Sequence, residues 1–261
     1  MPSSNPKNLG RGDEIVKIDL NCDIGESFGR YVLGEDEAIM PYVTSANIAC
    51  GMHAGDPSVM QHTVRLAKQY GLAVGAHPGW ADLQGFGRRA MSLSSADTEA
   101  LVLYQIGALA AFAQAEGILL THVKPHGALY NQAARDRDLA GAIARAVRAF
   151  SPDLILVGLA GSAMIEAGLE LGLRTAGEAF ADRRYNPDGT LAPRDRPGAV
   201  LELPEEAAAQ ALALATHGID FGGRHVRADT LCLHGDHPRA SENARLIRAT
   251  LAESGVVVER L

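Results

Sequence analysis

The chain has 261 residues, of which 47% are hydrophobic and 21% charged, and 24 basic against 31 acidic side chains give a formal net charge of −7. This composition excludes a collagenous, low-complexity or wholly disordered chain, and the mild acidity leads us to expect neither nucleic acid nor a membrane among its partners. Three cysteines without a close pair predict neither a disulfide framework nor a zinc ribbon.

The N-terminal segment is polar and rich in proline, glycine and serine, without the apolar core of a signal peptide. We predict a flexible tail over residues 1–13 and a single domain over residues 14–261. The longest apolar stretch, residues 100–115, is interrupted by glutamines and too short to span a bilayer. A cytoplasmic protein is therefore expected.

Short apolar runs alternate along the chain with longer segments of helical pattern. The predicted strands are residues 15–21, 46–50, 73–76, 118–124, 154–158, 174–178 and 230–233. Asp56-Pro57 and Ser94 are signals for helix starts, and Gly71 and Gly117 are signals for helix ends. This alternation predicts a parallel sheet, but periodicity does not distinguish a closed barrel from an open doubly wound sheet.

Two further helices are predicted in the C-terminal third. One begins at Pro204 and ends at Gly218, and the last begins at Pro238 and ends near Gly255. Before them, residues 180–198 form an unusually long connection, which is typical of a lid or a binding loop. The sequence contains neither a GxGxxG nor a GxxxxGK[ST] phosphate loop.

Polar side chains alternate with apolar ones in the first predicted strand. Asp19, Asn21 and Asp23 share one face, and the other face carries Ile18, Leu20, Cys22 and Ile24. A half-exposed antiparallel strand would show the same alternation. However, other predicted strands also end in polar residues, which favours a functional site.

The fourth predicted strand repeats this pattern with His122, Lys124 and His126 on one face. Lys124 is suited to bind an anion or a polarised carbonyl, and His126 is suited to transfer protons. The alternative is a structural ion pair between Lys124 and Asp19 or Asp23.

Six of the nine histidines lie at or just beyond the ends of predicted strands: His53, His77, His122, His126, His234 and His237. The same ends carry Asn47, Glu178 and Asp236, whereas His62, His217 and His225 are predicted to be surface or loop residues. Ligands of parallel α/β sheets and barrels bind at the carboxyl ends of the strands, so we predict the functional site there.

Asp23, His53 and His77 form a candidate metal site. No compact ligand signature such as HExxH accompanies them, so a site without metal is the favoured interpretation. Arg88 follows a glycine-rich turn and is a candidate for binding a carboxylate or phosphate, although such a turn is also ordinary. Cys22 and Cys50 are predicted to be buried as small apolar residues without a catalytic role.

These residues lie within long segments that resemble the LamB/YcsF family. The segments are Asp19-Leu-Asn-Cys-Asp-Ile-Gly-Glu26, Asn47-Ile-Ala-Cys-Gly-Met-His-Ala-Gly-Asp56, Gly75-Ala-His-Pro-Gly79, Gly85-Phe-Gly-Arg-Arg89, Val123-Lys-Pro-His-Gly-Ala-Leu-Tyr-Asn131, Glu178-Ala-Phe-Ala-Asp-Arg-Arg-Tyr-Asn-Pro-Asp-Gly189 and Leu233-His-Gly-Asp236. They follow one another in order over nearly the whole chain. The resemblance implies a TIM-like (β/α)7 barrel of the glycoside hydrolase/deacetylase type.

The resemblance also implies an activity, because this family is identified as the A subunit of the prokaryotic ATP-dependent 5-oxoprolinase. That enzyme converts 5-oxo-L-proline, ATP and two waters into L-glutamate, ADP and phosphate, and it requires subunits B and C. ATP, with its Mg²⁺, is then a co-substrate. A metal-dependent amidohydrolase or deacetylase acting alone, and a non-catalytic subunit that binds substrate, remain alternatives.

Within this implied reaction, we assign Lys124 to the amide or phosphoryl oxygen, and Asp23 with His126 to water activation and protonation of the leaving nitrogen. The predicted catalytic group is completed by Glu178, His234 and Asp236. The predicted substrate-binding residues are Asp19, Asn21, Asn47, His53, His77 and Arg88.

Overall fold

The structure is a computed structural model that describes residues 15–194, 196–221, 223–234 and 239–261. The predicted N-terminal tail, Asp236, His237 and the predicted helix start at Pro238 lie outside these described residues.

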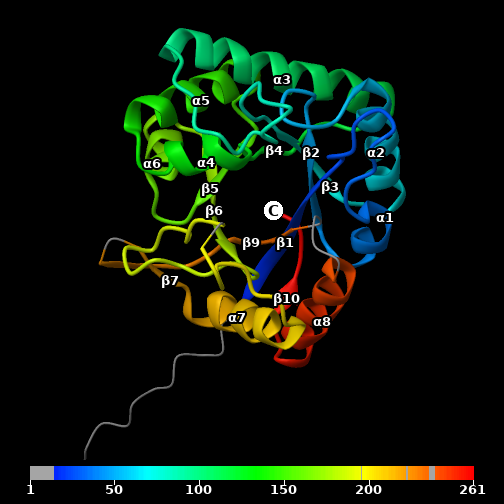
Figure 1. The fold of residues 1–261 in the computed structure, drawn as a ribbon. Coiled ribbons are helices and arrows are strands. Elements are labelled where there is room, and N and C mark those ends of the chain that lie inside the picture. Colours follow the sequence, from blue (N-terminus) through cyan, green and yellow to red (C-terminus); the bar gives the residue numbers. More distant parts are fainter. Residues whose placement is uncertain (1–14, 195, 222, 235–238) are drawn as a thin grey trace, which may run out of the picture.

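Seven parallel strands close on themselves to form a barrel (Figure 1). In order around the barrel they are β1 (Lys17–Ile24), β2 (Ser45–Ala49), β3 (Ala73–His77), β4 (His122–Val123), β5 (Ile155–Leu159), β6 (Arg174–Phe180) and β9 (Thr230–His234). β9 closes the ring because Thr230 is in register with Glu178 of β6 and with Asp19 of β1. The predicted seven-stranded α/β barrel is thus confirmed, and the open sheet is excluded.

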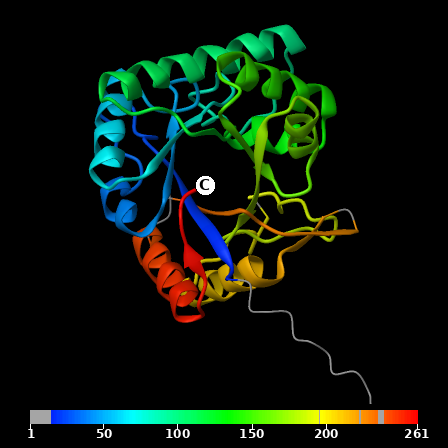
Figure 2. The same ribbon diagram turned by 180° about the vertical axis from the view of Figure 1, so that it is seen from behind.

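Helices surround the barrel on its outside, as the views from the front and from behind show (Figures 1 and 2). They are α1 (Asp36–Ile39), α2 (Pro57–Gln69), α3 (Ser95–Ala115), α4 (Gly127–Ala133), α5 (Arg137–Phe150), α6 (Ala163–Glu170), α7 (Pro204–His217) and α8 (Ala240–Glu253), with a 3-10 turn over Met40–Tyr42. A small antiparallel hairpin, β7 (Ile219–Phe221) and β8 (Arg224–Val226), and the short strand β10 (Val257–Val258), which pairs with β1, complete the fold.

The helix boundaries follow from the predicted capping residues. The Asp56 carboxylate accepts hydrogen bonds from the backbone N–H groups of Ser58 and Val59, and Ser94 accepts one from Asp97. α7 begins at Pro204 and is followed by Gly218 at φ +79°, as predicted.

The fourth strand is much shorter than the predicted run over residues 118–124, and that prediction was wrong in its extent. Ile118 instead donates its backbone N–H to the carbonyl of Ala113, and Gly117 at φ +72° bonds to Gln114. These residues satisfy the last carbonyls of α3, so they are not available to extend the ladder.

Strand β1 is buried on both faces from Ile18 to Ile24. The apolar face joins the core shared with the surrounding helices, and the polar face points into the barrel, where Asp19, Asn21 and Asp23 make hydrogen bonds. Since its partners β2 and β9 run parallel to it, the alternative of a half-exposed antiparallel strand is wrong.

The barrel interior is apolar at the amino end of β5 and β6. Ile155, Val157 and Ala176 form a small buried cluster there, and Leu261 packs against it. The C-terminus accordingly lies near the barrel axis in both views (Figures 1 and 2). Apolar side chains therefore fill this end of the interior.

Candidate functional site

A cavity of about 600 Å³ opens at the carboxyl ends of the strands. That volume is suited to a small-molecule ligand. Six predicted site residues line it: Asp23, His77, Arg88, Lys124, His126 and His234. The predicted loop over residues 180–198 also contributes to its wall, through Arg183 and residues 190–194 among others.

Five other predicted site residues lie buried beneath this cavity and are not among the residues that line it: Asp19, Asn21, Asn47, His53 and Glu178. Their positions favour holding the cavity residues in place rather than touching substrate. Asp236 lies outside the described residues.

Lys124 lies at the centre of a buried group that we call the lysine cluster: Asn21, Asp23, Lys124, Glu178 and Cys232. The Lys124 Nζ is 2.7 Å from Glu178 Oε1 and 2.9 Å from Asp23 Oδ1. It also donates to Asn21 Oδ1 and to Cys232 Sγ, each at 3.0 Å. The three N–H donors of the ammonium are thus matched by three hydrogen-bond acceptors, while Glu178 Oε1 contacts it as an ion pair without a hydrogen bond. A substrate oxygen can bind Lys124 by replacing one of the three acceptors.

Charge pairing overcomes the effect of burial on the ionisation of this cluster. Burial opposes charge on Lys124, but the carboxylates of Asp23 and Glu178 raise its pKa well above its ordinary value. Likewise, burial disfavours the Asp23 carboxylate, but His77 and Lys124 hold its pKa well below the usual range. Burial raises the pKa of the Cys232 thiol, so the sulfur is neutral near pH 7 and accepts from the ammonium.

A chain of hydrogen bonds beneath the cavity supports the lysine cluster. Asn47 donates to Asn21 Oδ1 at 2.7 Å and to Asp23 Oδ1 at 2.8 Å. Asn21 in turn donates to the hydroxyl of Thr230, at 2.7 Å, and Thr230 donates to the Asp19 carboxylate. This chain fixes the carboxamide and carboxylate oxygens that face Lys124.

His122 belongs to this supporting chain rather than to the cavity. Its Nε2 lies 2.8 Å from Asn47 Oδ1, which can only accept, so Nε2 carries the proton. Burial, followed by the charge of Lys124, lowers the pKa of His122 to about 3. The imidazole is therefore neutral at physiological pH.

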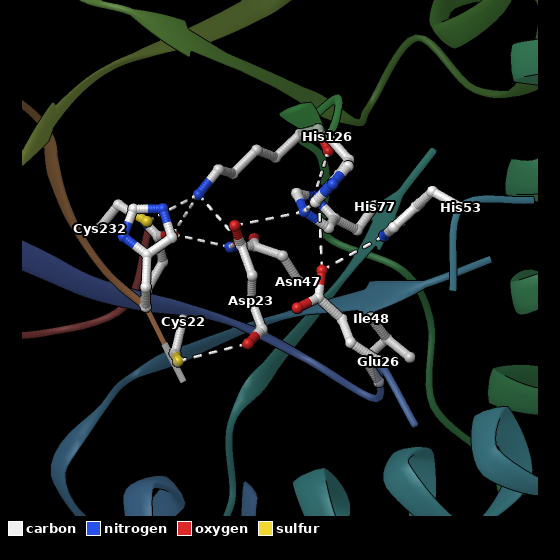
Figure 3. Close-up of polar contacts among 12 residues, drawn as sticks. Cys22, Asp23, Glu26, Asn47, Ile48, His53, His77, His126 and Cys232 are labelled. Carbon is white, nitrogen blue, oxygen red and sulfur yellow. Dashed lines mark hydrogen bonds and ion pairs between the residues drawn. The ribbon is translucent and has the colours of Figure 1, made fainter. Parts of the chain in front are cut away.

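A second group, the histidine cluster, consists of Glu26, His53, His77 and His126 (Figure 3). His77 Nε2 lies 3.0 Å from His126 Nδ1, and Glu26 Oε1 lies 3.3 Å from His53 Nε2 and 3.4 Å from His126 Nδ1. The rings of His53 and His126 are stacked, with 3.8 Å between their centroids. One donor atom from each residue falls within 4.8 Å of the others, so this cluster could hold a metal ion.

The carboxylate of the histidine cluster is Glu26, whereas the sequence interpretation placed Asp23 beside His53 and His77. Asp23 Oδ2 lies 3.3 Å from His77 Nε2, but its other oxygen is committed to Lys124 and Asn47. Burial lowers the pKa of both His53 and His126 well below the ordinary value. Both rings are therefore neutral and retain a lone pair near pH 7.

A carboxylate that sequence reasoning did not single out orients His234. Asp182 places its two oxygens 2.8 and 2.9 Å from His234 Nδ1, and it also accepts the backbone N–H of His234. Nδ1 must therefore carry a proton. The pKa of Asp182, which burial alone would raise, is lowered by His234.

Other residues at the cavity were also missed by the sequence interpretation. Tyr130 lies against Glu178, and burial together with that carboxylate raises the pKa of its hydroxyl well above 10. Arg183 is buried, lines the cavity and donates to the carbonyl of Ala192 at 2.6 Å. Cys232 and Asp182 could have been found from the sequence. Cys232 is two residues before His234 and Asp182 is four residues after Glu178, so in an extended chain each lies on the same face as that predicted site residue.

Two secondary predictions, on the burial of two cysteines and on the exposure of three histidines, are confirmed. Cys22 and Cys50 are buried, and burial raises the pKa of Cys50 to about 12. His62, His217 and His225 are exposed. Within the described ranges, none of the helices combines the length and apolar character needed to cross a membrane.

Comparison with known proteins identifies relatives over almost the full chain. The family model for LamB/YcsF matches residues 18–261. The chain is 59% identical to a protein of Symbiobacterium thermophilum named as the A subunit of 5-oxoprolinase, covering 94% of this chain and 95% of that one. It is 54% identical to the protein of the same name from Pyrococcus furiosus, with 93% and 97% coverage.

A solved structure agrees with this relationship. The crystal structure of the "Lactam Utilization Protein" from Thermus thermophilus superposes with a TM-score of 0.86 at 53% identity, covering 94% of this chain and 100% of that one. Sequence and fold therefore lead to the same conclusion: the chain belongs to the LamB/YcsF family.

Proposed function

We propose that this chain is the A subunit of an ATP-dependent 5-oxoprolinase that opens the lactam of 5-oxo-L-proline to L-glutamate together with subunits B and C. The observation that carries the proposal is the buried Lys124 ammonium, which lines the cavity between two carboxylates in a chain closely similar to proteins named as the A subunit of 5-oxoprolinase. ATP is the co-substrate, with its Mg²⁺.

Lys124 acts on the oxygen of the lactam amide. A five-membered lactam is a stable amide, and phosphorylation of its oxygen by ATP would make the ring carbon electrophilic. The Lys124 ammonium stabilises the negative charge on that oxygen or on the phosphoryl group. Its partners Asp23 and Glu178 keep the nitrogen in place.

Asp23 and His126 handle the protons in this proposal. The low pKa of Asp23 keeps it ionised, so it can orient water and accept a proton from it as the water attacks. His126 then returns a proton to the ring nitrogen as the C–N bond breaks. His77 lies between them, 3.3 Å from Asp23 and 3.0 Å from His126, and links the two groups.

Arginines on the cavity wall recognise the substrate carboxylate or a phosphate. Arg88 and Arg183 both line the cavity. Burial and the nearby Arg194 lower the pKa of Arg183 to about 10, which still leaves it charged at neutral pH. A guanidinium in this position matches the fork of a carboxylate.

The test is glutamate formation from 5-oxoproline by the purified chain alone, with each of its two partners, and with both, each with and without ATP. We expect product only when all three subunits and ATP are present. Glutamate formation that is independent of ATP, or no product from the full mixture, would contradict the proposal.

The histidine cluster favours one second candidate, a metal-dependent amide hydrolase acting without partners. The same assay separates the two candidates. The second predicts product from the chain alone, without ATP, and loss of that product after treatment with a chelator.

A further inference from the structure

The histidine cluster has an unusual arrangement of lone pairs. His77 donates its Nδ1–H to the backbone carbonyl of Lys124 at 2.7 Å, and His126 donates its Nε2–H to the carbonyl of Phe86 at 2.8 Å. Carbonyl oxygens only accept, so these contacts fix which nitrogen of each ring is protonated. In neutral rings, the remaining nitrogens, His77 Nε2 and His126 Nδ1, then direct two lone pairs at each other across 3.0 Å.

Two lone pairs at this separation repel unless something positive lies between them. A proton shared between the two nitrogens can fill that role in a metal-free chain. A metal ion between the two nitrogens would have two additional ligands, because Glu26 and His53 also place a donor atom close to them. The cluster thus brings three imidazole nitrogens and a carboxylate oxygen within 4.8 Å of one another.

The distances fit a tetrahedral ion. With metal–nitrogen bonds of about 2.0–2.1 Å, neighbouring ligand atoms of a tetrahedral zinc site lie about 3.3 Å apart. Three pairs in the cluster are separated by 3.0, 3.3 and 3.4 Å. All pairs fall within 4.8 Å. The rings of His53 and His126 are stacked in parallel, so binding of one ion by both requires one of these rings to turn towards it.

The backbone around the cluster is shaped to hold these rings. A Cβ at Gly87 would lie 2.7 Å from His53 Cβ and 2.9 Å from His126 Cδ2, and one at Gly79 would lie 2.6 Å from His53 Nδ1. Phe86 adopts φ +53°, a left-handed conformation that is costly for a phenylalanine, and its carbonyl is the one that orients His126. Carbonyl partners of this kind orient histidine ligands in metal sites.

We propose that the chain binds one transition-metal ion of the zinc class through Glu26, His53 Nε2, His77 Nε2 and His126 Nδ1. Imidazoles with one carboxylate suit Zn²⁺ and its neighbours, whereas Mg²⁺ and Ca²⁺ prefer sites built from oxygen ligands. The proposal concerns binding to the isolated chain, so it holds whichever substrate the cavity takes.

Metal binding would redistribute the proton-handling roles of the proposed reaction. The Nδ1 lone pair of His126 becomes a ligand and no longer accepts protons. His234, whose Nδ1–H is held by Asp182, then becomes the imidazole next to Asp23 that can exchange protons with a ligand in the cavity.

The test is direct metal analysis of the purified chain, stripped with a chelator and dialysed against Zn²⁺ or Co²⁺. We expect about one ion per chain and, with Co²⁺, the intense visible absorption of a tetrahedral site. Glu26→Gln and His77→Gln should each weaken Zn²⁺ binding about a hundredfold or more, beyond the loss caused by removing an outer-shell partner. His62→Gln, an exposed histidine on α2, is the matched control and should bind as the wild type does.

A second readout does not depend on the variants. Zn²⁺ should raise the thermal unfolding temperature of the wild-type chain in proportion to the logarithm of its concentration, and a chelator should reverse the shift. No stoichiometric binding to the wild type, or undiminished binding to folded His77→Gln, would overturn the proposal. Loss of 5-oxoprolinase activity plays no part in this test, so the two proposals can fail separately.

Discussion

The lysine and histidine clusters meet where Asp23 of the first lies 3.3 Å from His77 of the second, yet they satisfy their polar atoms in different ways. In the lysine cluster, one ammonium is held by two carboxylates, a carboxamide and a thiol, so the carboxylates have a cation supplied by the protein itself. In the histidine cluster, backbone carbonyls orient two imidazoles so that their free nitrogens converge. The first cluster contains its own cation, whereas the second is arranged for a cation from outside.

The largest effect is expected from Lys124→Ala, which removes the cation of the lysine cluster. It leaves Asp23 and Glu178 buried without their cation, and unfolding titrations should show a loss of about 3–5 kcal/mol in the free energy of unfolding. The variant should remain folded at 25 °C, and its turnover in the reconstituted assay should fall by about a thousandfold.

The exposed Lys68 of α2 supplies the matched control, because Lys68→Ala removes the same charge outside the barrel. Near-normal ATP-dependent glutamate formation by Lys124→Ala would refute the assignment of the lysine.

The second prediction concerns His122, beneath the lysine cluster, and the pH dependence of the free energy of unfolding. The pKa of His122 falls from 6.5 to about 3 on folding, so between these values the unfolded chain binds one more proton than the folded chain. The free energy of unfolding therefore decreases as the pH falls from about 6.5 towards 3. His53 and His126, whose pKa values are also lowered, act in the same direction.

His122→Gln keeps an N–H donor for Asn47 but cannot titrate. Urea unfolding at a series of pH values should show a slope that is shallower by up to one proton, about 1.4 kcal/mol per pH unit. Parallel curves for the wild type and His122→Gln would show that His122 is not neutral in the folded chain.

A smaller effect is expected from Asp182→Asn. This substitution tests whether catalysis requires the orientation of His234 by Asp182, in addition to the lysine cluster. Asparagine retains one acceptor for Nδ1–H but loses the negative charge, so folding should persist while kcat falls about a hundredfold. KM should change little, and the pH profile of kcat should shift. Asp153→Asn, at an exposed turn, is the control; an unchanged kcat and pH profile would exclude a role for Asp182.

The smallest effect is expected from adding one methyl group next to the histidine cluster. Gly87→Ala and Gly29→Ala introduce the same methyl group at similar positive φ, +62° and +56°, but only the first meets His53 and His126. Both should lose about 1 kcal/mol of stability from backbone strain. Only Gly87→Ala should also weaken Zn²⁺ binding, measured by competition with a chelator; equal affinities would show that the rings tolerate displacement.

Much of the barrel could be predicted from the sequence, because period-two alternation and helix caps are local signals. The polar face of β1 and the helix starts after Asp56 and Ser94 required no tertiary information. The shortness of β4 could not be predicted, since Ile118 is equally apolar in a strand or at the end of a helix. Ile118 ends the helix instead of extending the strand because its backbone N–H bonds to a carbonyl at the end of α3.

The site was predicted as a set of residues but not as two clusters. Lys124 and Asp23 were recognised from their strand faces, whereas Glu26 lies after Gly25, where φ +70° redirects the chain and ends the alternation. Whether Asn47 touches the substrate or supports Asp23 depends on depth within the barrel, and alternation along one strand contains no information about depth.

The packing of Leu261 against Ile155, Val157 and Ala176 closes the amino end of the barrel interior with apolar side chains. The hydrogen bonds that descend from Lys124 through Asn21 and Thr230 reach Asp19, which is only 2% exposed and also accepts hydrogen bonds from Thr44 and Ser45. Ligands reach Lys124 from the opposite end, where the cavity opens. A molecule that covers the cavity therefore stops the exchange of ligands with the site.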